Sequence, residues 1–396
     1  MELGQLNVKR DGNVDKYFAS IKTPGRISTQ IVAEALEKTI RTFPWPKSMR
    51  WGVSSLRWVR PLKGILCIFI KDAEHQVIDL QIDGIRSGSC TTGHRFMAPD
   101  YFTVKDFEDY KLKLRNAFVI LDNRERSEII LNDANNLAFA NGLDLINDDA
   151  LLEEVSGLVE WPVTLLGKVD NEFLDLPSEV LRASMKEHQK FFSLKNPKTE
   201  KIERFITIAN IESADNGATI LEGNQKVLYA RLSDAKFFWE NDLRLIQKDG
   251  LDTWLEKLKN VTFHNKLGSQ ADKVLRISAL TKKLVGPLAC DGEAAVNGAN
   301  ICKSDLTSEM VYEFPELQGV MGRYYAISCG YSDSVAKVCE EHYKPKGPND
   351  PVPTAMTSVA VALADKLDTL LGFWIINEKP TSSKDPFALR LSLIHI

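Results

Sequence analysis

Long apolar segments are missing from this sequence of 396 residues. No run approaches the roughly 18 consecutive apolar residues that a membrane-spanning helix requires, and residues 1–20 contain no apolar core of a secretory signal. Cysteine is scarce as well: the chain has 6, scattered and without a C-x-x-C pair, so the sequence predicts neither disulfides nor a zinc site. These absences together predict a cytoplasmic protein that does not span a membrane.

An excess of either charge is also missing. The chain has 50 lysine and arginine residues against 54 aspartate and glutamate residues, which gives a net charge of −4. This balance excludes a uniformly basic nucleic-acid-binding protein, although it allows local basic patches. With 44% hydrophobic residues, a chain of this length is expected to bury a sizeable core in roughly two or three domains.

Short catalytic motifs are absent too. The chain has no G-x-x-x-x-G-K-[ST] loop for ATP phosphates, no G-x-G-x-x-G after a strand, and neither H-E-x-x-H nor G-x-S-x-G. An enzyme of this length that acts alone usually shows one such arrangement. We therefore expect no complete catalytic centre within this chain.

The patterns that are present predict strands first and helices later. A β-hairpin is expected over residues 62–84, a helical stretch over 105–141, and strands over 162–167 and 205–211. After about residue 220 the pattern is nearly all helical, with an apolar stripe at gaps of three and four formed by Leu267, Ala271, Val274, Ile277, Thr281 and Leu284. Because strands and helices occupy separate regions instead of alternating, the predicted fold class is α+β. The predicted divisions are an α+β core region (1–215), a helical connector (216–258), an all-helical domain (259–390) and a tail (391–396).

One metal site is half present in the helical domain. His264 is expected to open a helix, His342 to close another, and Asp365 and Asp368 are spaced i, i+3 on a third. Such groups on a helical bundle are typical of HD-type metal-dependent phosphohydrolases, which also need a sequential His-Asp pair on an intervening helix. Residues 311–316 (VYEFPE) stand where that pair is expected and contain no histidine. The domain is therefore predicted to be HD-like, with a degenerate site at His264, His342 and Asp365 that holds no metal. A working phosphohydrolase that uses these residues is the alternative.

Cations and aromatic residues are interleaved in several places. The groups are Arg50, Arg57, Arg60 and Lys63 around Trp51 and Trp58; Lys186, His188 and Lys190 before Phe191 and Phe192; and Lys226, Arg231 and Lys236 on a predicted helix. Lysine and arginine side chains contact phosphates, and aromatic rings stack on bases, so this pattern suits nucleic-acid binding. Tryptophan beside arginine also suits an alternative, in which the ring anchors the core and the cation extends to solvent.

Several collinear strings between residues 45 and 390 resemble one family. They are KSMRWG (47–52), WVRP (58–61), GHRF (93–96), LVEWPV (158–163), SMKEHQKFF (184–192), RLSDA (231–235), FHNKLG (263–268), EFPELQG (313–319), MGRYY (321–325), ADKLD (364–368) and SKDPFALR (383–390). On these strings the chain resembles the beta subunit of the bacterial two-subunit glycyl-tRNA synthetase. Agreement of this length and order is not expected by chance.

The resemblance implies a division of labour between subunits. A separate alpha subunit would bind ATP, Mg²⁺ and glycine and form glycyl-adenylate, while the beta subunit binds and positions tRNA(Gly) in an alpha2beta2 complex. This chain would then bind no cofactor itself, and its HD-like domain would have lost the metal-binding pair. The candidate tRNA-binding residues are Arg50, Arg60, Lys186, Lys190, Arg231 and Arg323. A scaffold that assembles alpha subunits without touching RNA is a further alternative.

The resemblance also predicts that the chain is partial. Family members begin upstream of the KSMRWG string, and they continue beyond DPFALR (385–390) into a C-terminal anticodon-binding domain. Residues 391–396 (LSLIHI) depart from the family pattern. We therefore expect the chain to lack an N-terminal portion and the anticodon-binding domain.

Overall fold

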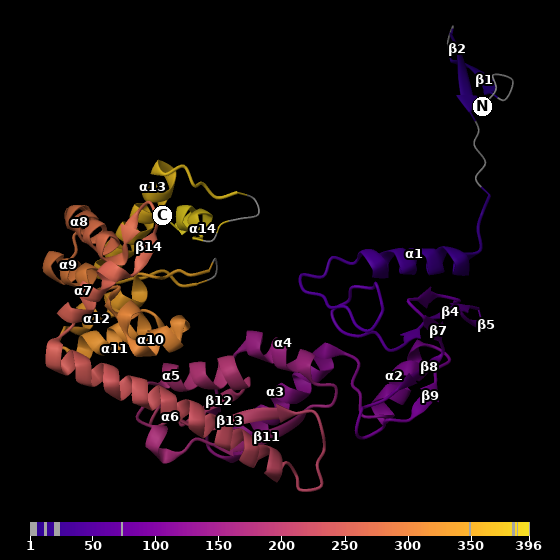
Figure 1. Ribbon diagram of the computed structural model, residues 1–396, viewed down its shortest axis with the longest axis horizontal. Coiled ribbons are helices and arrows are strands. Elements are labelled where there is room, and N and C mark those ends of the chain that lie inside the picture. The colour runs from indigo at the N-terminus through magenta and orange to yellow at the C-terminus, as the bar shows by residue number, and fades with distance from the viewer. Residues whose placement is uncertain are drawn as a thin grey trace. The chain divides into compact units, whose positions relative to one another are not determined.

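The computed structural model describes residues 6–11, 14–19, 24–72, 74–347, 350–381, 385 and 387–395. The chain forms two compact units, residues 1–126 and residues 127–396 (Figure 1), and each is described by itself. Short strands dominate the first part of the chain and helices follow, which confirms the predicted α+β class. The finer divisions predicted from the sequence stay predictions. Parts of the last resemblance string and of the predicted tail lie outside the described residues, namely Ser383, Lys384, Pro386 and Ile396.

The first unit combines short strand pairs with helices. Its elements are β1 (Leu6–Asp11), β2 (Val14–Ala19), α1 (Ser28–Thr42), β3 (Ile65–Leu66), β4 (Ile68–Lys71), β5 (Glu74–Val77), β6 (Gln81–Ile82), β7 (Ile85–Gly88), β8 (Cys90–Thr92), β9 (Tyr101–Thr103) and α2 (Phe107–Asn116). The hairpin predicted over 62–84 is present in part as β4–β5, whereas Ile82 belongs to a second hairpin, β6–β7. Leu56, Leu80 and Ile82 are buried, and Leu36 of α1 packs on them.

The turn between β6 and β7 holds the loop at residues 54–56 in place. Asp83 and Gly84 both have positive φ, 46° and 86°, as a two-residue type I′ hairpin turn requires. The Asp83 carboxylate accepts hydrogen bonds from Ser54 Oγ at 2.7 Å and from Leu56 N at 2.8 Å, and it pairs with Arg41 at 3.0 Å. The hydrogen bonds from Ser54 and Arg41 hold the pKa of this carboxyl well below its usual range. The loop is thereby tied to both the hairpin and α1.

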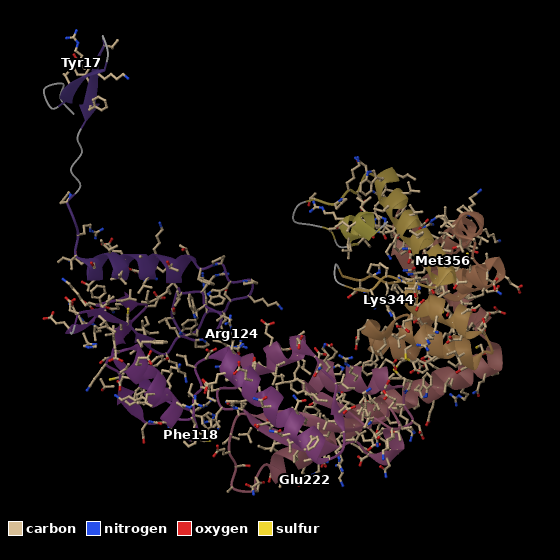
Figure 2. The ribbon with its side chains drawn as sticks, turned by 180° about the vertical axis from the view of Figure 1, so that it is seen from behind. Tyr17, Phe118, Arg124, Glu222, Lys344 and Met356 are labelled. Carbon is tan, nitrogen blue, oxygen red and sulfur yellow. The ribbon has the colours of Figure 1, made fainter. Side chains whose placement is uncertain are left out.

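The helical stretch predicted over residues 105–141 is present, but the structure divides it into two helices, α2 and α3 (Asn123–Ala140). After α2, Val119 N donates to Leu114 O at 2.9 Å, and Phe118, labelled in Figure 2, has a φ of 58°. Helices commonly end in this way with glycine in the left-handed position. Here phenylalanine takes that position, so the sequence contains no glycine to signal the end of the helix.

The second unit begins with an antiparallel sheet and its flanking helices. The elements up to residue 249 are α3, β10 (Asp144–Leu145), α4 (Asp149–Leu158), β11 (Val163–Lys168), α5 (Ser178–Ala183), β12 (Phe192–Lys195), β13 (Ile202–Ala209) and α6 (Ala218–Asp249), with a π-helical turn at Ser184–His188. The strand order is β10-β12-β13-β11, and the strands predicted over 162–167 and 205–211 correspond to β11 and β13. The long helix α6 (Figure 1) joins two cores: Leu228 packs with the sheet, whereas Ile246 packs with the later helices.

Helices make up most of the chain that follows. The elements are α7 (Asp252–Lys257), β14 (Thr262–His264), β15 (Gly268–Ser269), α8 (Gln270–Leu288), α9 (Gly292–Ile301), α10 (Glu309–Glu313), α11 (Val320–Ser328), α12 (Asp333–Glu341), α13 (Met356–Ile375) and α14 (Leu389–His395). Short 3₁₀ turns lie at Asn171–Phe173, Leu258–Asn260, Ser304–Thr307 and Pro315–Leu317.

His264 does not open a helix, so that prediction is wrong. It lies in β14, and α8 starts only at Gln270, after a reciprocal capping box between Ser269 and Asp272. The apolar stripe predicted for this helix is present, since Ile277 is fully buried on it. Within the described ranges, no helix combines the length and the hydropathy needed to span a bilayer.

Candidate functional site

An exposed basic region flanks Trp58 in the first unit. Met49 and Trp58 form a backbone bridge, in which Met49 N donates to Trp58 O at 2.9 Å and Trp58 N donates to Met49 O at 3.3 Å. We call this region the arginine–tryptophan surface; its members are Lys47, Arg50, Arg57, Arg60 and Lys63 with Phe43, Trp45 and Trp58.

The aromatic rings of this surface pack on one another and on the core. The centroids of the Trp45 and Trp58 rings are 4.9 Å apart in an edge-on contact, and the Phe43 ring lies 4.5 Å from that of Trp45. Trp58 and Trp51 also pack against the cluster around buried Leu56. The alternative in which tryptophan anchors the core is therefore confirmed for both rings. The anchored rings give the neighbouring cations a rigid base.

The cations of this surface have no acidic partner within the described residues. The side chains of Arg50, Arg57 and Arg60 are exposed, as are those of Lys47 and Lys63, and none of them forms an ion pair or a hydrogen bond there. Several acidic residues of the same unit pair with other cations, as in Arg26–Glu34, Arg41–Glu37, Arg41–Asp83 and Arg86–Asp79. Exposed cations without an acidic partner are available to bind a polyanion such as a phosphate backbone.

The other candidate tRNA-binding residues lie in the second unit, and each has an acidic partner. The pairs are Lys186–Asp148 (2.7 Å), Lys190–Glu154 (3.0 Å), Arg231–Glu313 (3.9 Å) and Arg323–Glu340 (3.4 Å). Asp148 also caps α4, because it accepts a hydrogen bond from Leu151 N at 3.1 Å, so Lys186 supports a helix end. Arg50 and Arg60 thus belong to the unpaired surface, while the remaining four are engaged in ion pairs. Their roles in RNA binding stay predictions.

A buried charge cluster lies among the helices of the second unit. Asp365 on α13 binds Lys273 Nζ of α8 through Oδ1 at 2.7 Å, and Lys303 Nζ at the end of α9 through Oδ2 at 2.8 Å. The ammonium of Lys273 lies 4.1 Å from the centroid of the Phe263 ring, and that of Lys303 lies 3.8 Å from the Tyr343 centroid. We call Lys273, Lys303 and Asp365 the lysine–aspartate cluster. It joins α8, α9 and α13 through a single carboxylate.

The predicted HD-like positions are only partly assembled. His342 follows α12, and its Nε2 lies 3.9 Å from Asp365 Oδ2. Burial lowers the pKa of the His342 imidazole well below its usual value, so the ring is neutral and its Nδ1 donates to Val338 O at 2.8 Å. His264 is engaged elsewhere, because its Nε2 faces Glu378 Oε2 at 3.1 Å.

A lysine contacts the carboxylate that a metal would need. Lys303, two residues after the end of α9, binds Asp365 Oδ2, whereas the prediction that places the missing pair at residues 311–316 stays a prediction. Both oxygens of Asp365 contact ammonium groups, which would repel a divalent cation. No group of three His, Cys, Asp or Glu side chains in the part of the chain that the structure describes could hold a metal ion. The phosphohydrolase alternative therefore finds no support in this geometry.

Charge pairing decides the protonation state of Asp365. Burial alone would raise the pKa of its carboxyl, but the charges of Lys273 and Lys303 outweigh burial and hold this pKa well below the usual range. Burial lowers the pKa of the Lys273 ammonium, and the charge of Asp365 opposes that change. Because the cluster holds more positive than negative groups, its buried cations depend on this one carboxylate.

Sequence reasoning missed both lysines of the cluster and a second buried aspartate, Asp305. Lys273 lies on the apolar face of α8, one turn before Ile277. A lysine on the apolar face of a helix is the feature of the sequence that could have indicated a buried charge here. Asp305 Oδ2 accepts hydrogen bonds from Gly319 N at 2.5 Å and Gly322 N at 3.0 Å, and burial raises the pKa of its carboxyl to about 6. These bonds fix the glycine that ends the EFPELQG string.

Comparison with known proteins gives one consistent result. A family model described as glycyl-tRNA synthetase beta subunit matches residues 1–396. The glycine–tRNA ligase beta subunit of a Ruegeria species is 61% identical over 381 residues, which cover 96% of this chain and 56% of that protein. The protein of the same name from Dinoroseobacter shibae is 58% identical over 99% of this chain and 54% of its own length. That from Phenylobacterium zucineum is 51% identical over 98% of this chain and 57% of its own length. The chain therefore spans about half the length of the curated relatives it matches.

Proposed function

The chain belongs to the glycyl-tRNA synthetase beta subunit family, and we propose that it supplies a tRNA-binding surface to a glycine–tRNA ligase. The resemblance recognised in the sequence is confirmed by the family match. In the proposal, an alpha subunit binds ATP, Mg²⁺ and glycine, and this chain positions tRNA(Gly) for it without a cofactor of its own. Assembly as alpha2beta2 in the cytoplasm belongs to the same proposal, and the six free thiols suit a reducing compartment.

The arginine–tryptophan surface carries this proposal. Its cations are exposed and unpaired within the described residues, so a phosphate backbone can bind them without first breaking an internal ion pair. The cations in the second unit differ in this respect, because Lys186 or Arg231 would have to exchange a carboxylate for a phosphate. An A-form acceptor stem is recognised by shape and by its phosphates, which suits an anchored group of arginines.

Salt-dependent binding of tRNA(Gly) tests the surface directly. The variant Arg50→Gln/Arg57→Gln/Arg60→Gln removes only exposed and unpaired charges, so the fold should stay intact. Each lost phosphate contact should reduce the slope of log K against log [salt] by about 0.7–0.9, so we expect the loss of three contacts to reduce it by about 2–3.

A charge-matched variant separates this surface from general attraction. Arg26→Gln/Arg86→Gln/Lys226→Gln removes the same charge from exposed residues that already pair with Glu34, Asp79 and Glu222. We expect its affinity and slope to stay close to those of the unmodified chain. Equal losses in both variants would show that the binding follows net charge alone, and would contradict the assignment of this surface.

Glycylation with a purified alpha subunit tests the larger part of the proposal. We expect tRNA(Gly) to be charged from glycine and ATP only when alpha subunit and this chain are both present. A full-length beta subunit from a relative is the positive control. If only that control supports charging while this chain still binds tRNA, residues 1–396 bind but do not suffice for catalysis. Alpha-subunit binding without any RNA binding would favour the scaffold alternative.

A further inference from the structure

The GHRF string (93–96) forms a turn that is fixed on the first unit. Gly93 lies so close to the end of α2 that a Cβ at this position would overlap the Cβ of Ala117. The next residue, His94, is 1% exposed, and its backbone N–H donates to Ala117 O at 2.8 Å. Ala117 precedes Phe118, which Figure 2 labels. Because only glycine fits this close approach, the string is held against the end of α2.

The buried imidazole of His94 shapes the residues that follow. Its Nδ1 accepts hydrogen bonds from Phe96 N at 3.3 Å and from Met97 N at 3.2 Å. Ala98 N also donates to His94 O at 2.9 Å, which closes one helical turn. A side chain that accepts from the second and third N–H groups of such a turn acts as its N-cap. His94 therefore holds the backbone of residues 95–97 in place.

The turn presents Arg95 and Phe96 to solvent. Phe96 is 69% exposed, and the guanidinium carbon of Arg95 lies over its ring at 5.4 Å from the centroid. Arg95 is itself exposed, and within the described residues it forms no ion pair or hydrogen bond. Asp100, the nearest acidic residue along the chain, is not paired with it. The turn thus offers an exposed aromatic ring and an unpaired cation side by side.

An exposed phenylalanine by itself indicates little, and the chain has others. Phe107 in the same unit is 61% exposed, but no arginine lies over its ring among the residues that the structure describes. Phe96 differs because a glycine without room for a side chain and a buried histidine fix its turn, and because an arginine accompanies its ring. An aromatic ring that is fixed in solvent beside a free cation is suited to binding.

The charge of the first unit favours a polyanion as the ligand. Residues 1–126 contain 21 lysines and arginines against 15 aspartates and glutamates, whereas residues 127–396 contain 29 against 39. A chain with a small net charge therefore combines a basic first unit with an acidic second unit, as is typical when one part of a protein binds nucleic acid. A protein partner would have to place an acidic group and a ring-stacking group together, whereas every RNA nucleotide contains both a phosphate and a base.

We propose that this turn binds an unpaired nucleotide of RNA, with Phe96 stacked on the base and Arg95 on the adjoining phosphate. Bases within a duplex stack on their neighbours, so a protein ring stacks on bases of single-stranded segments. The turn would bind such a segment of the tRNA, in addition to the paired stem expected at the arginine–tryptophan surface. This proposal rests on RNA binding by the chain, but it concerns different residues and is tested separately.

Fluorine NMR of the chain labelled with 4-fluorophenylalanine tests the stacking. The chain has 18 phenylalanines, and Phe96→Leu identifies the resonance of interest. The probes are hexaadenylate, an abasic ribose-phosphate chain of the same length, and a short blunt-ended RNA duplex. We expect hexaadenylate to shift the Phe96 resonance, because a stacked base changes the environment of the ring. The abasic chain and the duplex should leave this resonance in place.

Exposed variants with a matched control measure the contribution of each side chain. We expect Phe96→Leu to weaken hexaadenylate binding about tenfold, and Phe96→Tyr, which keeps the ring, to change it by less than about twofold. Arg95→Gln should reduce the slope of log K against log [salt] by about 0.7, the loss of one phosphate contact with a single strand. Phe107→Leu removes an equally exposed phenylalanine of the same unit and should bind as the unmodified chain does.

The outcomes separate this proposal from the proposed function. If hexaadenylate and tRNA(Gly) bind without moving the Phe96 resonance, the chain binds RNA elsewhere and the assignment of this turn is wrong. Equal shifts by hexaadenylate and the abasic chain would contradict stacking by Phe96. A shift by purified alpha subunit and by no RNA would make the turn a protein contact and overturn the assignment. If no RNA binds at all, this proposal and the proposed function both fail.

Discussion

Replacing Lys303 by methionine tests how the second unit holds its buried charges. Methionine keeps an unbranched side chain of similar length but removes the ammonium, which contacts Asp365 Oδ2 at 2.8 Å and has a side chain only 5% exposed. Lys273 still pairs with the other oxygen at 2.7 Å, so the variant retains one cation for one carboxylate. Asp365→Asn is the contrasting change, because it leaves both ammonium groups without a counter-charge.

The expected losses follow from the contacts that disappear. A hydrogen bond to a charged group contributes about 1.5–3 kcal/mol and a desolvated cation–π contact about 2 kcal/mol. Removing a buried ammonium also removes its desolvation penalty, which offsets part of this loss. We therefore expect Lys303→Met to lower the free energy of unfolding by about 1–2 kcal/mol. For Asp365→Asn we expect about 4–5 kcal/mol, since breaking a buried pair usually costs 3–5 kcal/mol and two cations depend on this carboxylate.

Urea unfolding followed by tryptophan fluorescence measures the difference, because Trp254 lies in the adjoining buried core. Lys337→Met is the matched control: Lys337 pairs with Asp333 at 2.7 Å on the exposed side of α12, where its side chain is 43% exposed. We expect the control to change stability by less than about 0.5 kcal/mol. If Lys303→Met costs as much as Asp365→Asn, the cluster does not hold an excess of positive charge that depends on one carboxylate, and the reasoning fails.

Further predictions concern groups around the same helices. The folded pKa of Asp305, about 6, lies above its ordinary value, so ionisation of this carboxyl lowers the stability of the fold as pH rises from about 4 to 6. Asp305→Asn should remove this contribution and raise the free energy of unfolding at pH 7 by up to about 3 kcal/mol. Chemical unfolding at several pH values measures both effects. Gly319→Ala should lower the free energy of unfolding by about 2 kcal/mol or more, because the φ of Gly319 is 84° and the new Cβ would lie 2.6 Å from Cys339 O. Its melting temperature should fall further than that of Gly223→Ala, a control at a position where the space around the new Cβ is open. Tyr325→Phe removes a 2.7 Å hydrogen bond to buried Asp242 and should cost about 1.5–3 kcal/mol in urea unfolding, whereas unchanged stability would contradict a role for that bond.

Local periodicity accounts for most of what the sequence predicted about the fold. The spacing of Val274 and Ile277 predicted α8, and the strand pattern over 162–167 predicted β11. The break after α2 was missed, because the chain ends that helix with a left-handed Phe118 where glycine is usual. His264 was misplaced for a related reason: it precedes the apolar stripe, but the helix begins only after the capping box at Ser269.

Charge pairing was much less accessible from sequence than secondary structure. Lys186 and Asp148 are 38 positions apart, and their contact joins the π-helical turn to the start of α4. Lys303 and Asp365 are 62 positions apart and meet only because α9 and α13 pack together. The unpaired state of Arg50 and Arg60 likewise depends on which acidic residues the fold brings near them. Clusters of cations were therefore predictable, whereas their partners were not.

Two buried aspartates in the helical part of the chain differ in pKa direction because they have different partners. Asp365 contacts two full positive charges, which outweigh its burial and keep it ionised. Asp305 Oδ2 accepts hydrogen bonds from the backbone N–H groups of Gly319 and Gly322, and these bonds, together with the charge of Lys303, do not outweigh burial. Asp365 therefore contributes stability that is lost as pH falls below its ordinary pKa of about 3.8, whereas Asp305 lowers stability as pH rises above the same value. Similar burial thus gives opposite pH dependence, and the identity of the partner decides the sign.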